Sequence, residues 1–544
     1  MRFKTFFAGL GAVSLAAAAL AQAPAEAPEF TADGFRSHVA FLADDLLEGR
    51  ETGTRGYDVA ARYVATRFEA LGLKPAVEGS WFQQVPFFQY RLSDAPASLS
   101  VGGREFLDRR DVMLSPSPVE GPETLEAPVV FVGYGLQAPE IGVDDYKGLD
   151  VKGKIVAVLN GFPKGMRSDI GAHLNSDKRR VASERGAIGM IMLRTTGEAQ
   201  RRPWARLQES AGEPALTWLG EGGQPYTASP NIRVRATLDH PAAEALFAGA
   251  RRPLARVLAE AEREGGKPKG FALKPMVKVV QQSTVRRISS PNVLAVLPGS
   301  DPALANEYVL LTAHLDGLGV HDKAGDDDIH NGAMDNATGI ATILEVARAM
   351  ATGPNRPRRS ILFAAVTAEE KGLLGAQYLA RHPVVGGGKV VGVVNLDMPV
   401  LLYDFSDVIA FGAEHSTIGA AVERAGRGMN VALAEDPLPH EGLFTRSDHY
   451  RFVQEGVPSV FLMTGFSNGG KEKFTDFLST YYHKPTDDMK LPIDWQAGAK
   501  FARINYEIAR EIADAPDAPR WYSDSFFGKA LAPNQAKAER PVAR

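Results

Sequence analysis

The sequence of 544 residues contains no cysteine. The absence of thiols excludes a disulfide framework, thiolate zinc ligands, a cysteine nucleophile and a lipid anchor on cysteine. An excess of charge of one sign is also missing, because 61 basic and 65 acidic residues leave a net charge of −4. We therefore expect no nucleic acid and no anionic membrane surface as partner.

Long hydrophobic runs are scarce as well, and the longest, Phe6 to Leu20, follows Arg2 and Lys4. This pattern predicts a secretory signal peptide over residues 1–21, cleaved after Ala21. The alternative is a membrane anchor, which needs about 20 apolar residues, more than this run supplies. We expect an exported protein, periplasmic or extracellular, with no stable membrane insertion after signal cleavage.

The remaining chain is too long for a single core, and its hydrophobic periodicity and composition change along its length. Helical periodicity over 30–73 and short strands over 82–117 predict the first part of a main domain at 28–122. Strand candidates rich in β-branched residues indicate an inserted β-rich module at 123–265. The main domain continues over 270–515, and residues 516–544 are predicted to form an irregular tail.

Within 270–515, buried strands alternate with helices, which predicts an α/β fold with a doubly wound mixed sheet. The predicted strands include Tyr308–Ala313, Ser360–Val366, Val390–Leu396 and Pro458–Met463. Acidic or imidazole side chains follow three of them: His314 and Asp316, Glu369 and Glu370, and Asp397. In open α/β sheets ligands bind beyond the carboxyl ends of the strands, so these side chains should converge there.

The converging residue types are those that bind zinc, which accepts imidazole nitrogen and carboxylate oxygen. Two neighbouring metals need a bridging carboxylate, and Asp335, before the helical pattern Ile340 to Met350, suits that role. We assign His314 and Asp397 to one metal, and Glu370 with His483 to the other. Each residue alone is typical of a capped strand end, a helix start or a polar turn. Their joint occurrence at successive strand ends indicates a two-metal site.

Two further acidic residues receive roles in this hypothesis. Asp316 lies two residues from His314, on the same face of an extended segment, and should accept the imidazole N–H. Glu369 cannot easily reach the metal that Glu370 binds. It is therefore free to take a proton from a water molecule in the site.

Five short segments carry a resemblance to a known family. They are Asn331–Gly339, Ala368–Gly372, Asn395–Met398, Ser447–His449 and Tyr482–Asp487, and they resemble the signature blocks of the di-zinc aminopeptidase family. Leucyl aminopeptidases and glutamate carboxypeptidases are among its members. The segments Phe131–Gly135 and Gly186–Gly189 resemble the protease-associated domain that many members insert into the catalytic fold.

The resemblance implies a zinc metallopeptidase with two zinc ions per chain and a peptide or protein substrate. It assigns the metals to the same five residues and general acid/base work to Glu369. It also implies that Tyr482 hydrogen-bonds the oxyanion and that the Asp335–Asn336 peptide is cis. One departure is Met334, where many relatives carry a second acidic residue, which puts one extra contact to the site in doubt.

Several alternatives stay open at this point. Aminopeptidase action is favoured by its frequency in the family, whereas carboxypeptidase or dipeptidase action would use the same site. A glutaminyl cyclase-like acyltransferase and a non-catalytic scaffold are related alternatives, although every ligand position is filled here. Gly465–Gly469 fits the elbow of a serine hydrolase with Ser467 as nucleophile, and Gly465–Lys471 nearly fits a phosphate loop. We expect Gly470-Lys471 to continue a loop, which argues against the elbow. The oligomeric state stays open.

Overall fold

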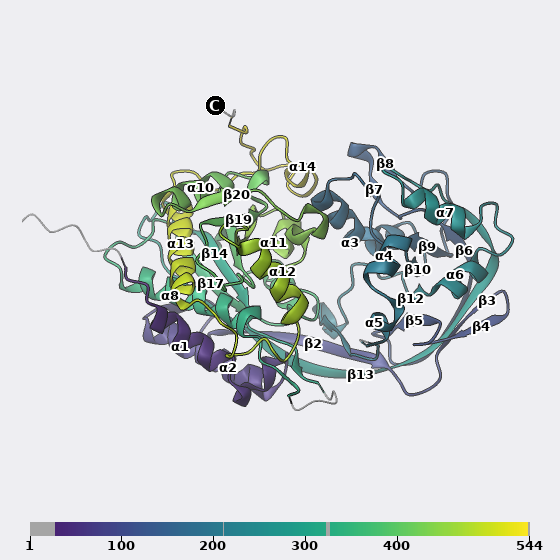
Figure 1. Cartoon of the computed structure of the whole chain (residues 1–544), viewed down its shortest axis with the longest axis horizontal. Helices are drawn as coiled ribbons and strands as arrows, with labels where there is room; N and C mark the ends of the chain where they lie inside the picture. Colours follow the sequence, from purple (N-terminus) through teal and green to yellow (C-terminus); the bar gives the residue numbers. More distant parts are fainter. Residues whose placement is uncertain (1–27, 210, 322–326, 542–544) are drawn as a thin grey trace, which may run out of the picture.

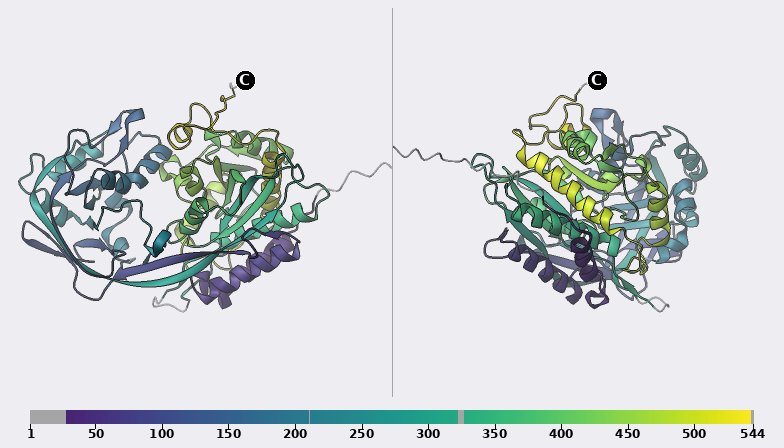
Figure 2. Two further views of the ribbon diagram at one scale, coloured as in Figure 1. Left: turned by 180° about the vertical axis from the view of Figure 1, so that it is seen from behind. Right: turned by 60° about the vertical axis from the view of Figure 1, so that its left-hand side comes forward.

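The computed structural model describes residues 28–209, 211–321 and 327–541. The predicted signal peptide lies outside these residues. The described chain forms two lobes that lie side by side (Figure 1). The larger lobe contains residues 28–81 and 294–541, the smaller lobe contains residues 93–282, and the long strands β2 (Phe82–Leu92) and β13 (Phe271–Leu297) run through both (Figure 2).

Strand β13 joins the lobes and is 27 residues long. Its first half pairs with β6 and β3 of the smaller lobe, and its second half pairs with β2 and then β17. Side chains of the first half largely alternate between buried and exposed, the pattern of a strand with one covered face. The predicted strand at 292–297 is therefore only the end of a much longer one.

The sheet of the larger lobe positions the candidate site. Four parallel strands lie in the order β17-β14-β18-β21, namely Ser360–Val366, Glu307–His314, Lys389–Leu396 and Ser459–Thr464. Antiparallel β19 (Asp407–Phe411) follows β21, and β20 (Ala432–Ala434) pairs with β19. The chain leaves β14 to build β17 on one side and β18 on the other. This reversal makes the carboxyl end of β14 a topological switch point, where α/β sheets open a crevice.

Helices cover both faces of this sheet (Figure 1). In α1 (Ala32–Leu42), Phe35, Val39 and Leu42 lie at helical spacing and are buried against α8 and α13. Thr31 caps this helix by accepting a hydrogen bond from Gly34 N at 3.1 Å. Further helices of the lobe include α2 (Arg55–Ala70), α8 (Thr338–Thr352), α9 (Leu374–Arg381), α10 (Ile418–Gly428), α11 (His449–Gln454), α12 (Gly470–Thr480) and α13 (Trp495–Asp514).

The smaller lobe has its own parallel strands, with β9 (Ile155–Leu159) between β6 (Gly121–Phe131) and β10 (Gly189–Leu193), and β12 (Val234–Leu238) beyond β10. Its other elements are β3 (Ser98–Val101), β4 (Arg104–Leu107), β5 (Val112–Ser115), β11 (Ala215–Trp218), α3 (Ser168–Glu184), α4 (Thr196–Arg201), α5 (Trp204–Glu209), α6 (His240–Leu246) and α7 (Leu254–Ala261). β3 and β5 precede the predicted module start at 123, yet they pair with β13 and β12. The predicted domain boundaries stay predictions.

Short elements complete the described chain: β1 (Lys74–Pro75), β7 (Gln137–Ala138) with β8 (Val143–Asp144), and β15 (Gly319–Val320) with β16 (Ile329–His330). The tail is more ordered than its lack of periodicity predicted, because it contains α14 (Phe526–Leu531). The fully buried Trp521 donates to Gly456 O at 2.8 Å and anchors the tail. Among the described helices, none combines the length and apolar content needed to cross a bilayer.

Candidate metal centre

The five predicted ligand residues meet at the carboxyl edge of the larger sheet. His314 ends β14, Glu370 follows β17, Asp397 follows β18, Asp335 precedes α8, and His483 lies in the turn after α12. His314 Nε2 is 3.2 Å from both Asp335 Oδ1 and Asp397 Oδ1. His483 Nε2 is 3.3 Å from Asp335 Oδ2 and 3.4 Å from Glu370 Oε2. Asp335 thus lies in the middle, with one oxygen towards each imidazole.

These distances fit a metal ion on each side of Asp335. Tetrahedral zinc with bonds of 2.0–2.1 Å holds neighbouring ligand atoms about 3.3 Å apart. The donor atoms of His314, Asp335 and Glu370 all lie within 4.8 Å of one another. One imidazole with a terminal and a shared carboxylate on each side is a donor set that zinc accepts. The residues present therefore fit the metal chemistry that the sequence predicted.

The electrostatics also show a surplus of negative charge. Burial lowers the pKa of His314, but Asp397 and Glu369 outweigh it and raise that pKa well above its usual value. Burial likewise opposes the shift at His483, where Asp335 and Glu370 raise the pKa to about 9. Burial, then Asp335, raises the pKa of Glu370 to about 8. The cluster retains protons because it lacks positive charge, and metal ions would supply that charge.

The backbone around Asp335 is held by groups that the sequence did not reveal. Its peptide bond to Asn336 is cis, as the resemblance implied. The Asp487 carboxylate accepts the N–H groups of Met334 at 2.8 Å and Asp335 at 3.0 Å. Asn336 donates to Leu396 O at 2.9 Å, beside the end of β18. Asp487 was part of a recognised segment, but nothing in its spacing indicated this role.

Asp316 differs from its predicted role. His314 Nδ1 lies 3.0 Å from the backbone carbonyl oxygen of Asp316, whereas the carboxylate is 4.0 Å away. The carboxylate instead accepts the backbone N–H groups of Glu369 at 3.1 Å and Glu370 at 3.3 Å. The prediction failed because the chain turns after His314, so the two side chains do not share a strand face. Asp316 fixes the turn that presents the two glutamates.

Glu369 lies beside the donor cluster, but its carboxylate is not one of the groups in the imidazole–carboxylate contacts described above. Burial, together with the neighbouring carboxylates Glu370, Asp397 and Asp448, raises the pKa of Glu369 well above the usual carboxyl range. Positive charge from bound metal ions would lower this pKa and favour the carboxylate form that a general base needs. Glu369 therefore lies among the carboxylates of the cluster, and its role as proton acceptor stays a prediction.

Tyr482 lies over the second imidazole. Its ring stacks on that of His483, with 3.8 Å between ring centroids. Burial, then the carboxylates of Asp335 and Glu370, raises the pKa of the Tyr482 phenol far above its usual value. The hydroxyl therefore stays protonated at neutral pH and remains a hydrogen-bond donor beside the cluster.

Three supporting residues were not predicted from the sequence. Ser447 donates to Asp397 Oδ2 at 2.5 Å and accepts from Asn395 Nδ2 at 2.6 Å, which orients that carboxylate. Both carboxylate oxygens of the buried Asp448 have no hydrogen-bond partner. Arg50 is buried and donates to the carbonyls of Leu42, Leu315, Asn331 and Gly332, so it ties the N-terminal segment to two loops of the site. Only Ser447 and Asp448 lie in a recognised segment.

The structure contradicts the loop that was predicted after Ser467, so the serine-hydrolase alternative is judged on the contacts of His483 and Ser467. Gly470-Lys471 does not continue a loop but begins α12, so Ser467 does lie between a strand and a helix. However, His483, the histidine that follows Ser467 in the sequence, turns its Nε2 towards Asp335 and Glu370. Ser467 N donates to Asp407 at 3.2 Å, in an exposed loop. The imidazole therefore belongs to the acidic cluster and not to a serine.

Fold and site together define an α/β protein with a metal-binding cluster at the carboxyl edge of its sheet. Residues 292–509 match the model of peptidase family M28. The matched region contains all five predicted ligand residues, so the site lies within the match. The match does not include the smaller lobe, so its resemblance to a protease-associated domain stays a prediction.

Curated relatives agree with this assignment. A probable zinc metalloprotease of Pyrenophora teres f. teres (strain 0-1) is 26% identical over 44% of this chain and 56% of its own length. Leupeptin-inactivating enzyme 1 of Streptomyces exfoliatus is 27% identical over 42% of this chain and 53% of its own. A probable leucine aminopeptidase 2 of Aspergillus fumigatus is 30% identical over 34% of this chain and 35% of its own length. The chain spans about half the length of the first two of these relatives and a third of the last.

Among solved structures, the aminopeptidase from Aneurinibacillus sp. strain AM-1 has a similar fold. Its TM-score is 0.52 at 20% identity, and the match covers 90% of this chain and 95% of that one. Because the match extends over nearly the whole of both chains, the two-lobed architecture is shared.

Proposed function

We propose that this protein is a zinc-dependent peptidase, specifically an aminopeptidase, and that it hydrolyses peptide bonds at the centre between His314 and His483. The observation that carries the proposal is the central position of Asp335, which offers one oxygen to each imidazole at 3.2 and 3.3 Å. A carboxylate shared in this way is what two adjacent metal ions require.

The residues divide into two ligand sets. His314 and Asp397 would hold one zinc ion, Glu370 and His483 the other, and Asp335 both. When bound, the zinc ions polarise the scissile carbonyl and lower the pKa of a water molecule towards about 7. Ser447 orients Asp397, and the Asp316 carboxylate orients the Glu369–Glu370 turn.

Glu369 performs the proton transfers. Its carboxylate takes a proton from the attacking water and delivers it to the leaving amine, while the C–N bond breaks. Tyr482 keeps its hydroxyl proton and donates a hydrogen bond to the oxygen that becomes negative.

Charge around the site favours a substrate with a free amino end over one with a free carboxylate. Lys371, beside a ligand, already pairs with Glu51 at 3.1 Å. Lys484, beside another, donates to Ser479 O at 2.5 Å. The buried Arg50 donates to backbone carbonyls. These cations are engaged in the contacts given and are therefore less available to bind a terminal carboxylate. The names of the aminopeptidase relatives support the same choice.

Export to the periplasm or outside the cell belongs to this proposal. It is supported by the basic and apolar start of the sequence. A peptide or protein is the proposed substrate.

The test uses a chelator-treated sample and the same sample after zinc is restored. We expect aminoacyl chromogenic substrates to be cleaved only with zinc. A blocked amino terminus should abolish cleavage, whereas a blocked carboxyl terminus should not. Activity that survives chelation would support a serine hydrolase and refute the proposal. A scaffold would show no turnover in either state, and a cyclase would act only on N-terminal glutamine.

A further inference from the structure

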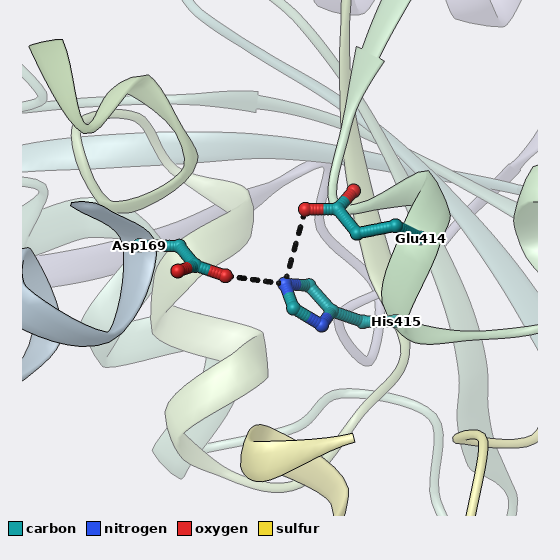
Figure 3. Close-up of side chains that lie close together, drawn as sticks. All are labelled: Asp169, Glu414 and His415. Atoms are coloured by element: carbon teal, nitrogen blue, oxygen red, sulfur yellow. Dashed lines mark ion pairs between the residues drawn. The ribbon is translucent and has the colours of Figure 1, made fainter. Parts of the chain in front are cut away.

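A second group of metal-binding residue types lies between the two lobes, away from the M28 site. Asp169 is in the first turn of α3 in the smaller lobe, and Glu414 and His415 lie between β19 and α10 in the larger lobe (Figure 3). Their donor atoms lie within 4.8 Å of one another. The residues come from segments about 245 positions apart in the sequence, so only the packing of the lobes brings them together.

The geometry around His415 suits a bound cation. Its Nε2 is 3.0 Å from Asp169 Oδ2 and 3.3 Å from Glu414 Oε1. Nevertheless this nitrogen is buried without a hydrogen-bond partner, so neither oxygen lies along its N–H direction. Figure 3 shows the two oxygens on either side of the direction in which Nε2 points. A buried ring nitrogen aimed between two carboxylates has the arrangement of a metal ligand.

The surroundings fix this ring and leave the metal position accessible. His415 is 2% exposed, and its ring lies between those of Phe444 and Phe527, with centroids 5.1 and 4.8 Å away. Asp169 and Glu414 line a cleft of about 1640 Å³ between the lobes. Solvent in that cleft can complete a coordination shell that the three side chains leave open.

Arg167 is the group that competes with a cation. Its Nη2 donates to Asp169 Oδ2 at 2.5 Å. This side chain is 59% exposed, so it can move into the cleft when another positive charge binds. Asp169 Oδ1 keeps its bond from Ile170 N at 2.7 Å, which leaves Oδ2 as the ligand atom.

We propose that Asp169, Glu414 and His415 form a further zinc-class divalent metal site that clamps the smaller lobe to the larger one. One imidazole with two carboxylates is a donor set for zinc and related transition ions. Helix α3 also contacts the larger lobe through His173 Nδ1, 2.6 Å from Tyr450 Oη in α11. A bound ion would add a second link, from α3 to the segment between β19 and α10. This inference does not depend on the proposed peptidase activity.

The test counts zinc in the full-length protein after excess metal is removed by desalting. Wild type should retain one equivalent more than His415→Gln. His240→Gln changes an exposed histidine that pairs with Glu244 in the same manner, at 3.3 Å, and should retain as much zinc as wild type. Equal zinc in wild type and His415→Gln would overturn the proposal.

A second variant, Glu414→Gln, tests the site independently in case His415→Gln does not fold. Glu414 is 54% exposed, so Glu414→Gln should fold normally. We expect it to weaken zinc binding at this site at least tenfold in competition with a chromogenic chelator. Affinity within twofold of wild type would contradict the proposal.

A His314→Ala/His483→Ala background separates this site from the M28 centre. That variant should still bind one zinc equivalent, and adding His415→Gln should remove it. If the M28 centre bound no metal, both wild-type and His415→Gln totals would fall, but their difference of one equivalent would remain. A background variant that binds no zinc would overturn the clamp.

Discussion

The two lobes share an architectural plan but differ in the residues beyond the ends of their strands. In the larger lobe, β14, β17 and β18 end on imidazole and carboxylate groups that face one another. In the smaller lobe, β9 ends before Asn160 and Gly161, and the buried side chain of Lys178 lies at this end of the strand. Lys178 Nζ donates there to Leu159 O at 2.8 Å and Gly161 O at 2.6 Å. Parallel strands provide an edge in both lobes, and the residues beyond the strands decide whether it can hold metals.

The largest effect should come from removing an imidazole of the larger lobe. His314→Ala deletes a donor from a set in which each zinc ion has three protein ligands. We expect the variant to lose metal and to show no detectable peptidase activity. Elemental analysis measures the metal content and an aminoacyl substrate assay measures the activity, with the exposed His240→Ala as control. Full metal content in His314→Ala would show that this residue is not a ligand.

Glu369→Gln should separate proton transfer from metal binding. The amide cannot accept the water proton, so we expect kcat to fall by about 10²–10⁴-fold with metal content unchanged. The exposed Glu472→Gln, on α12, is a matched control. Substantial activity in a metal-replete Glu369→Gln protein would exclude Glu369 as the base.

A smaller effect should follow when a carboxylate loses its supporting group. Ser447→Ala removes the hydrogen bond to Asp397 Oδ2, and such losses reduce metal affinity by about 10- to 100-fold. Ser459→Ala removes a buried serine hydroxyl that bonds instead to Val457 O at 2.9 Å. Chelator competition should distinguish the two variants, and equal affinities would show that Ser447 does not support the ligand.

The last prediction concerns stability, with no change expected in activity, and involves the buried lysine of the smaller lobe. Burial lowers the pKa of Lys178 from 10.5 to about 7. Between these values the unfolded state binds more protons than the folded state. Stability should therefore rise with pH, by up to about 1.4 kcal/mol per pH unit.

Lys178→Met should remove this part of the pH dependence. Thermal unfolding at pH 7, 8 and 9 measures it, with the exposed Lys152→Met as control. Because other groups titrate as well, the difference between wild type and variant is the informative quantity. Parallel curves for wild type and Lys178→Met would contradict the shifted pKa.

The sequence predicted the larger lobe best where periodicity and strand ends coincide. Strands β14, β17, β18 and β21 appear within one or two residues of their predicted bounds. It did not reveal that β13 crosses both lobes, because a continuous strand and two separate ones share the same alternation. The loop predicted at Gly470 is the start of α12, since the glycines around it weaken a helical pattern without preventing one.

The candidate site likewise contains residues that the sequence predicted and residues that it did not. Donor residues at strand ends were predictable because zinc restricts ligand types and the sheet directs them to one edge. The contacts of Asp316 were not, because they depend on a turn between strand and loop. Arg50 and Asp487 act on backbone groups distant in sequence, and no local pattern encodes such contacts.

The central claim is that Asp335 is shared by two zinc ions. Anomalous diffraction at the zinc absorption edge, from crystals of the zinc-restored protein, tests it most directly. We expect one peak among His314, Asp335 and Asp397, and a second among Asp335, Glu370 and His483. No peak beside Asp335, or a single peak that leaves either imidazole without a metal, would contradict the account.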